Sequence, residues 1–260
     1  MLIAHVTDPH VLGTETTRQR LTSVADALTG TTTPIAFVTE TLFPYARTHI
    51  RSYLERHGDS PQYLELLRTF RQEHAADAHA RHNVPPWSAL GADARASVEA
   101  YAEWLMARDR KSSALKELQG YVWEEGYRNG ELVAPVFPDV PRAFERWRTA
   151  GTEIGIFSSG SVLAQRWLFR CSSAGDLSDY LCCHFDTNTG PKKDASSYAR
   201  IARAVGRRPD EIVFVSDVVA ELDAARAAGM KTIMSQRPGN RPQPAHDHDT
   251  VASFDEIRSG

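Results

Sequence analysis

The second half of the chain alternates short apolar runs with amphipathic segments, and this pattern constrains the fold more than any other feature. Apolar runs predicted as strands occupy residues 153–160, 180–187, 211–217 and 231–236. Between them, apolar residues recur at steps of three and four, which is typical of helices. Strands and helices that alternate over short connections form a parallel sheet with helices on both faces. Residues 2–7 predict one further strand near the beginning.

The region that follows the first predicted strand has a different rhythm. Apolar residues recur at helical spacing over residues 40–57, 60–80 and 92–130. We therefore predict the α/β class, with a Rossmann-like parallel sheet core and an all-helical cap inserted after the first strand. The predicted core comprises residues 1–36 and 134–260, and the predicted cap comprises residues 37–133. Residues 238–250, rich in proline and polar side chains, are predicted to form a loop.

Composition narrows the classes of function. The chain has 260 residues, of which 42% are hydrophobic, enough for one substantial core with a smaller attached domain. A net charge of −3 without a basic cluster argues against nucleic acid and membrane partners. Three cysteines without CxxC spacing argue against a disulfide framework or a structural zinc site and favour a reducing cytoplasm. The first residues lack a basic segment, so they make a poor signal peptide, and no run reaches 18 apolar residues.

Ligands of an open parallel sheet bind at the carboxyl ends of its strands, so the residues that follow each predicted strand are the candidate site. Ser158, Ser159 and Gly160 end one strand just before a helix. Hydroxyls and free N–H groups there can bind an anion, or they can form an ordinary capped turn. Lys192 lies in a later loop between strand and helix, where a lysine either neutralises a phosphate or is solvated.

Two acidic residues near the strand 211–217 give the sharpest local signal. Asp217 ends this apolar strand, and Glu221 follows four residues later. A carboxylate at such a strand end suits Mg²⁺, which prefers oxygen ligands; the alternative is helix capping. Together with the anion site and Lys192, this pattern predicts phosphoryl chemistry assisted by Mg²⁺. Such chemistry also needs a carboxylate nucleophile at another strand end.

At these residues the chain resembles the haloacid dehalogenase-like hydrolases and, more closely, their enolase-phosphatase E1 family. The stretches that carry the resemblance are TTTPIAFVTETLFPYAR (31–47), LQGYVWEEGYRNGEL (118–132), FPDVPRAFERW (137–147), IFSSGSVLAQRWLF (156–169), FDTNTGPKKDASSYARIA (185–202) and FVSDVVAELDAARAAGMKT (214–232). The resemblance implies a Mg²⁺-dependent enzyme acting on 2,3-diketo-5-methylthiopentyl 1-phosphate, a small phosphate ester, as a monomer or weak homodimer.

The resemblance also implies roles for single residues. Ser158 and Ser159 would bind phosphate and Lys192 would pair with it. Asp217 would hold Mg²⁺, with Glu221 or Ser216 in support. Near the end of the predicted cap, three residues would lie on the cap side of the pocket: Trp123, Glu124 and Glu125.

Two departures from the family pattern affect catalytic positions. The first family motif reads Asp-Ile-Glu-Gly-Thr-Thr, whereas this chain has Ala-Leu-Thr-Gly-Thr-Thr at 27–32, so both of its carboxylates are missing. The Lys-Gly-His run that follows WEEGY in the family is here Val-Ala-Pro at 133–135.

Three hypotheses address the missing nucleophile. Asp8 can replace it, since LIAHVTD is an apolar strand that ends in a carboxylate; Asp8 would then also be a metal ligand, and His10 would be the acid/base. Asp26 lies one residue out of register and would need a bulge. The third hypothesis is an inactive or repurposed site that binds a small phosphorylated or dicarbonyl ligand.

Two further enzyme classes share single features with this sequence. The opening MLIAHVTDPHV is similar to that of calcineurin-like metallophosphoesterases, but the other motifs of that class, GNH[DE] and GHxH, are missing from the sequence. A whole enzyme of that class is therefore excluded. The remaining hypothesis is that the first strand alone was exchanged with the beginning of such an enzyme. A dehalogenase would use an aspartate without a metal, and Asp217 with Glu221 argues against it.

Overall fold

A computed structural model describes residues 2–6, 30–58, 60–88 and 91–257 of the chain. Its sheet has six parallel strands in the order β3-β2-β1-β4-β5-β6. Their bounds are β1 Leu2–Val6, β2 Ile154–Ser158, β3 Leu181–Phe185, β4 Val213–Ser216, β5 Lys231–Ser235 and β6 Asp249–Val251. The α/β class with a parallel sheet, predicted from the alternating pattern, is confirmed.

Strand β1 occupies the central part of the sheet, between β2 and β4. Leu2 pairs with Ile154 on one side and with Val213 on the other, and Val6 pairs with Ser158 at the carboxyl end. The predicted strand at residues 2–7 is therefore found at residues 2–6. Strand β1 thus lies between the two strands that end in Ser158 and Ser216.

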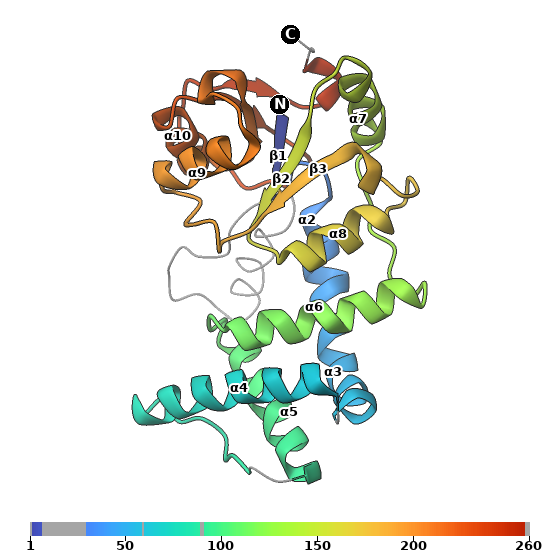
Figure 1. The fold of residues 1–260 in the computed structure, drawn as a ribbon, viewed down its shortest axis with the longest axis vertical. Helices are drawn as coiled ribbons and strands as arrows, with labels where there is room; N and C mark the ends of the chain where they lie inside the picture. Colours follow the sequence, from blue (N-terminus) through green and yellow to red (C-terminus); the bar gives the residue numbers. More distant parts are fainter. Residues whose placement is uncertain (1, 7–29, 59, 89–90, 258–260) are drawn as a thin grey trace.

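The two faces of the sheet are covered by different helices (Figure 1). Helices α7 and α8 lie on one side, and α9 and α10 lie on the other; their bounds are α7 Asp139–Thr149, α8 Val162–Arg170, α9 Ala195–Val205 and α10 Val219–Ala227. Strand β2 contributes to both cores because neighbouring side chains point to opposite faces. Ile156 belongs to the cluster on the α7–α8 side, and Phe157 packs edge-on against Tyr198 of α9.

The remaining long helices lie beyond the carboxyl ends of the strands (Figure 1). They are α3 Phe43–His57, α4 Pro61–His79, α5 Gly91–Ala107 and α6 Ser113–Arg128, reached from the sheet through α2 Ile35–Phe37 and a π-helical turn at Val38–Leu42. An all-helical insertion after the first strand was predicted and is observed. The domain limits at residues 36/37 and 133/134 stay a prediction.

One predicted helical stretch, residues 92–130, is interrupted in the structure. Helix α5 ends at Ala107 and α6 begins at Ser113. Asp109 has a left-handed backbone with φ 49°, which does not fit a continuous right-handed helix. Ser112 then caps α6, since its Oγ accepts a hydrogen bond from the Leu115 N–H at 2.9 Å. Helical periodicity on both sides of the break concealed it in the sequence.

The predicted loop 238–250 is also corrected at its end. Residues Asp249–Val251 form β6, which pairs with β5 from Ile233↔Asp249 to Ser235↔Val251. A three-residue edge strand with two exposed side chains has too little apolar pattern to be recognised.

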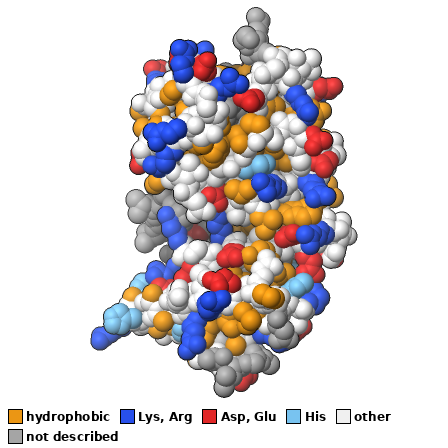
Figure 2. Space-filling model, in the orientation of Figure 1, with side chains coloured by type: hydrophobic (Ala, Val, Ile, Leu, Met, Phe, Trp, Pro, Cys, Tyr) orange, Lys and Arg blue, Asp and Glu red, His pale blue; other side chains and the backbone are white. Residues whose placement is uncertain are grey.

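The described surface carries no extended field of one charge on the face shown in Figure 2, where basic and acidic side chains are interspersed. Within the described residues, no helix combines the length and the apolar character needed to cross a membrane.

Candidate active site

A fully buried ion pair lies at the carboxyl ends of β3 and β4. Lys192 comes from the loop between β3 and α9, and Glu221 from the first turn of α10. The Lys192 Nζ lies 2.7 Å from Oε1 of Glu221, and neither side chain is exposed to solvent. Ser216, the last residue of β4, donates its hydroxyl to the other carboxylate oxygen at 2.8 Å. These contacts fix an ammonium group inside the protein, at the edge of the sheet where ligands of such folds bind.

Asp217 follows β4 directly and is 4% exposed. The backbone of Gly30 lies against its carboxylate: a Cβ built on Gly30 would be 2.3 Å from Oδ2 of Asp217. Gly30 also has φ +127°, a conformation open to glycine but not to other residues without strain. This position therefore requires glycine for two independent reasons.

The loop of residues 30–33 is held through its backbone carbonyls. Asn240 donates its side-chain N–H to the Gly30 carbonyl at 2.9 Å, and Arg237 donates Nε–H to the Thr31 carbonyl at 3.1 Å. The Phe137 N–H donates to the Thr32 carbonyl at 3.0 Å. The loop is thus tied to segments that lie about one hundred and two hundred residues later in the chain.

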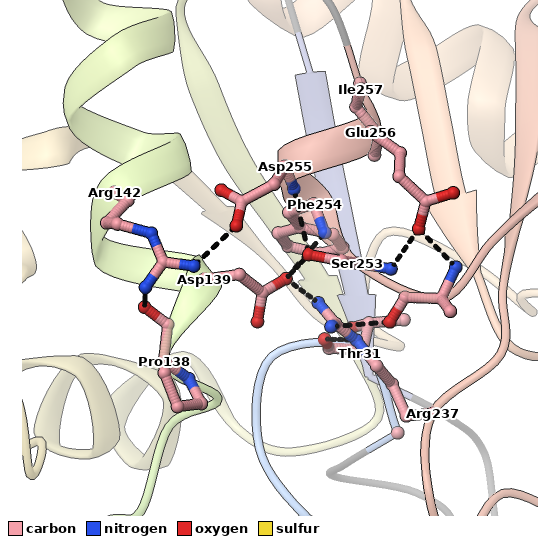
Figure 3. A network of polar contacts seen from close by, with 12 residues as sticks. Thr31, Pro138, Asp139, Arg142, Arg237, Ser253, Phe254, Asp255, Glu256 and Ile257 are labelled. Carbon is pink, nitrogen blue, oxygen red and sulfur yellow. Dashed lines mark hydrogen bonds and ion pairs between the residues drawn. The ribbon is translucent and has the colours of Figure 1, made fainter.

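Arg237 is the centre of the network in Figure 3. Its side chain is 4% exposed, and its guanidinium lies 2.7 Å from Oδ2 of Asp139 at the start of α7. The rings of Phe137 and Phe254 flank it, with centroids 4.7 and 4.6 Å from Cζ. Burial alone would raise the pKa of Asp139, but the bonds from Arg237 and from the Phe254 N–H hold that pKa below its ordinary value.

Several buried hydroxyls near the strand ends have no hydrogen-bond partner within the described part of the chain. They are Oγ1 of Thr32, Oγ1 of Thr33 and Oγ of Ser159. Buried polar groups are nearly always satisfied in folded proteins, so such hydroxyls mark a place where a ligand can complete the bonding. A hydroxyl can donate to the oxygens of an anion such as phosphate.

The predicted phosphate loop, Ser158 to Gly160, follows β2. The hydroxyl of Ser158 accepts from the Gly160 N–H at 3.0 Å, and Gln165 of α8 donates to the Gly160 carbonyl at 2.9 Å. The next residue, Ser161, caps α8 through the Ala164 N–H at 3.2 Å. Both interpretations offered by the sequence are thus compatible with the geometry: the turn is capped, and Ser159 still presents a hydroxyl.

The three predicted cap residues lie on α6 but face different surroundings. Trp123 donates its indole N–H to the Leu42 carbonyl at 2.8 Å and lines a narrow slot of about 10 Å³ that also reaches Ser158. Glu124 pairs with Arg128 at 2.6 Å. Glu125 points toward α3, where it contacts Arg56 at 2.7 Å and His57 at 3.2 Å. Trp123 thus shares a cavity lining with Ser158, a predicted phosphate-binding residue.

The sequence did not indicate every residue that contributes to this region. Lys116 extends from the first turn of α6 to the loop after β3, where its Nζ lies 3.9 Å from Oδ2 of Asp186. Asn240 lies inside the predicted loop 238–250, and Arg237 directly precedes it. Neither position carries a pattern that would have marked it.

Asp8, His10 and Asp26 lie outside the described residues. Asp8 is two positions beyond Val6, the last residue of β1. In the remainder of the chain, as far as it is described, no three histidine, cysteine or acidic side chains are grouped so as to hold a metal. The Asp217 carboxylate is of the ligand type that a hard cation prefers, and the Gly30 backbone packs directly against it.

Comparisons with known proteins agree with this arrangement. The family model for haloacid dehalogenase-like hydrolases matches residues 28–229. An enolase-phosphatase E1 from Synechococcus elongatus is 48% identical over 237 residues, covering 91% of this chain and 98% of that one. Another, from Pseudomonas aeruginosa, is 42% identical over 229 residues, covering 88% and 94%. The resemblance predicted from the sequence is confirmed.

Solved structures give the same result for the fold. The UTR4 protein from Saccharomyces cerevisiae matches with a TM-score of 0.71 at 30% identity, covering 98% of each chain. A mutant of CbbY from Rhodobacter sphaeroides, crystallised in complex with xylulose-(1,5)bisphosphate, matches with a TM-score of 0.51 at 17% identity, covering 98% of this chain and 94% of that one; that likeness concerns the fold alone.

Proposed function

We propose that this chain, which belongs to the haloacid dehalogenase-like hydrolases and, within them, to the enolase-phosphatase E1 family, is a Mg²⁺-dependent phosphatase of methionine salvage. Its class is that of the phosphoric monoester hydrolases. The proposed substrate is 2,3-diketo-5-methylthiopentyl 1-phosphate or a closely related small phosphate ester. Relatives named for this chemistry cover nearly the whole chain. A cytoplasmic location fits the three cysteines, all of them free.

One observation carries the proposal. The fully buried ammonium of Lys192 and several buried hydroxyls that lack a partner among the described residues belong to segments that all follow strands of one sheet. A phosphate ester would supply oxygens for those hydroxyls and negative charge for the lysine. The same strand ends bring Asp217, a carboxylate suited to Mg²⁺.

In the proposed mechanism, Ser158 and Ser159 bind and orient the phosphate, and Gly160 shapes this phosphate-binding turn through its backbone bonds to Ser158 and Gln165. Lys192 balances negative charge on the phosphoryl oxygens, and Glu221 holds Lys192 in place. Mg²⁺, when bound, neutralises charge on the transferring phosphoryl group. Asp217 and Asp8 would hold it. Both oxygens of Glu221, the third predicted ligand, already contact Lys192 and Ser216, so we propose that Glu221 supports the metal site by holding these two residues.

Asp8 is the proposed nucleophile because it follows the central strand β1 by two residues. His10 would move the proton to the leaving alcohol and from the attacking water. On the opposite side of the pocket, Trp123 would contact the substrate, whereas Glu124 and Glu125 would support the cap through their arginine partners.

The test is phosphate release from the diketo phosphate, measured with and without Mg²⁺. Asp8→Asn should lower turnover by at least about 10³-fold, since removal of a nucleophile typically costs several orders of magnitude. Asp26→Asn is the matched control and should retain activity, while Asp217→Asn should abolish the response to Mg²⁺.

Two results would contradict this assignment. Full activity in Asp8→Asn with loss in Asp26→Asn would move the nucleophile to Asp26. A folded wild-type protein that binds the ester without turnover would favour the alternative, a diverged member that binds a small phosphorylated or dicarbonyl ligand. That alternative takes its support from Ala27 and Thr29, which stand where the family has carboxylates.

A further inference from the structure

Strand β3 lies at one edge of the sheet and contains two consecutive cysteines. Leu181 pairs with Ile154 of β2, but the next residue of β2, Gly155, pairs with Cys183. Cys182 is therefore the extra residue of a β-bulge. A bulge interrupts the alternation of side chains that would send neighbouring residues to opposite faces. Here it brings the two sulfur atoms to 3.1 Å from each other.

The spacing favours a shared ligand over a bond between the two sulfurs. Both cysteines are free, and the 3.1 Å between their sulfurs exceeds the disulfide length of about 2.0 Å. Neighbouring Cα atoms are about 3.8 Å apart, which is shorter than the range of about 4.4–6.8 Å that disulfides prefer. An atom bonded to both sulfurs avoids this strain because the sulfurs can stay apart.

The exposure and the acidity of Cys182 also favour reaction at this pair. Cys182 is exposed, and the hydrogen bond from the Cys183 thiol lowers the pKa of Cys182 to about 7. The same bond raises the pKa of Cys183. Cys182 is thus the more acidic of the two thiols, and the thiolate is the reactive form of a cysteine. Cys171, the third cysteine, differs in two ways. Burial raises its pKa, and within the described residues its sulfur has no contact with another cysteine.

We propose that Cys182 and Cys183 form a vicinal dithiol site for a thiophilic electrophile that takes two sulfur ligands, of the trivalent arsenical class. An arsenoxide, R–As=O, would condense with both thiols. Two As–S bonds form, the As=O bond is lost, and the oxygen leaves as water with the two thiol protons. No atom changes its oxidation state. The site is separate from the proposed phosphatase site and does not depend on it.

The test uses phenylarsine oxide with the intact, folded chain and follows the adduct by mass spectrometry under native conditions. We expect one phenylarsenic group per chain, removed by 2,3-dimercaptopropanol but not by an equal concentration of 2-mercaptoethanol. Cys182→Ser and Cys183→Ser should each abolish the dithiol-specific adduct, and Cys171→Ser should retain it. Thermal unfolding establishes that each variant is folded.

Because any two adjacent cysteines can react in an unfolded chain, the rate must be compared with that of the protein in urea. Prepositioned sulfurs and an exposed Cys182 predict uptake in the folded chain at least as fast as in the unfolded chain. Uptake at least tenfold slower in the folded chain would overturn the proposal. So would an adduct that persists in either single serine variant or that disappears in Cys171→Ser.

Discussion

Lys192 and Glu221 form a salt bridge of 2.7 Å in which both side chains are fully buried. The lysine belongs to the loop after β3 and the glutamate to the helix after β4, so the pair joins two strand ends that are not adjacent in the sheet order. A buried charge is costly unless it is paired and hydrogen-bonded. The pair therefore constrains the fold and also orients the ammonium for its proposed role in phosphate binding, and mutations can separate these two roles.

The first prediction concerns this pair. Glu221→Gln removes the buried carboxylate that faces the Lys192 ammonium and should destabilise the protein by about 3–5 kcal/mol. The double substitution Lys192→Met with Glu221→Leu removes both charges and should recover most of that stability. It should nevertheless release no phosphate, since the ammonium is gone. Denaturant unfolding and phosphate release measure the two effects. A double variant as unstable as Glu221→Gln would show that charge burial is not the cause.

The second prediction concerns Gly30. In Gly30→Ala the new Cβ would lie 2.3 Å from the Asp217 carboxylate, so the loop or the carboxylate must move. We expect the Mg²⁺ concentration for half-maximal activity to rise at least tenfold. Gly130→Ala is a matched control, because Gly130 also has positive φ, +74°, but a Cβ there meets nothing within 4 Å. Gly130→Ala should lose about 1 kcal/mol of stability and leave the Mg²⁺ response unchanged. Equal Mg²⁺ responses in the two variants would contradict the argument.

The sequence was sufficient to predict those site residues whose position follows from the local pattern of apolar and polar residues. Ser158 and Asp217 each come at the end of an apolar run, and parallel strands place such ends at one edge of the sheet. The break between α5 and α6 was missed because the periodicity continues on both sides of Ser112. The direction of Glu125 was not predictable, since helical periodicity does not tell which neighbouring helix a polar residue faces. In the structure it faces α3.

Arg237 and Asn240 illustrate the other limit. Both act through partners about two hundred residues away in the sequence, the carbonyls of Thr31 and Gly30. No local rule connects an arginine in a proline-rich segment with a backbone oxygen near the beginning of the chain. Only the folded arrangement shows that these side chains hold the loop beside Asp217.

The last prediction concerns Arg237 and its ion pair with Asp139. Arg237→Met leaves a buried carboxylate without its cation and should destabilise the protein by about 3–5 kcal/mol at pH 7. Arg237→Lys should also destabilise it, because an ammonium cannot reproduce the planar contacts with Thr31, Ala252 and the two rings. Arg208→Met, at an exposed arginine paired with Asp210, is the control and should change stability by less than about 1 kcal/mol.

The pH dependence tests the cause of this effect. In the wild type the folded pKa of Asp139 is lowered, so its contribution to stability is complete above the unfolded value, about 3.9, and is lost as pH falls through the folded pKa. In Arg237→Met, burial without the cation raises the pKa of Asp139. As the pH falls, Asp139 is therefore protonated in the folded variant, and the cost of burying its charge disappears. The difference in unfolding free energy between wild type and Arg237→Met should therefore shrink from pH 7 to pH 3. A constant difference across that range would assign the loss to packing against Phe137 and Phe254 instead of to the ion pair.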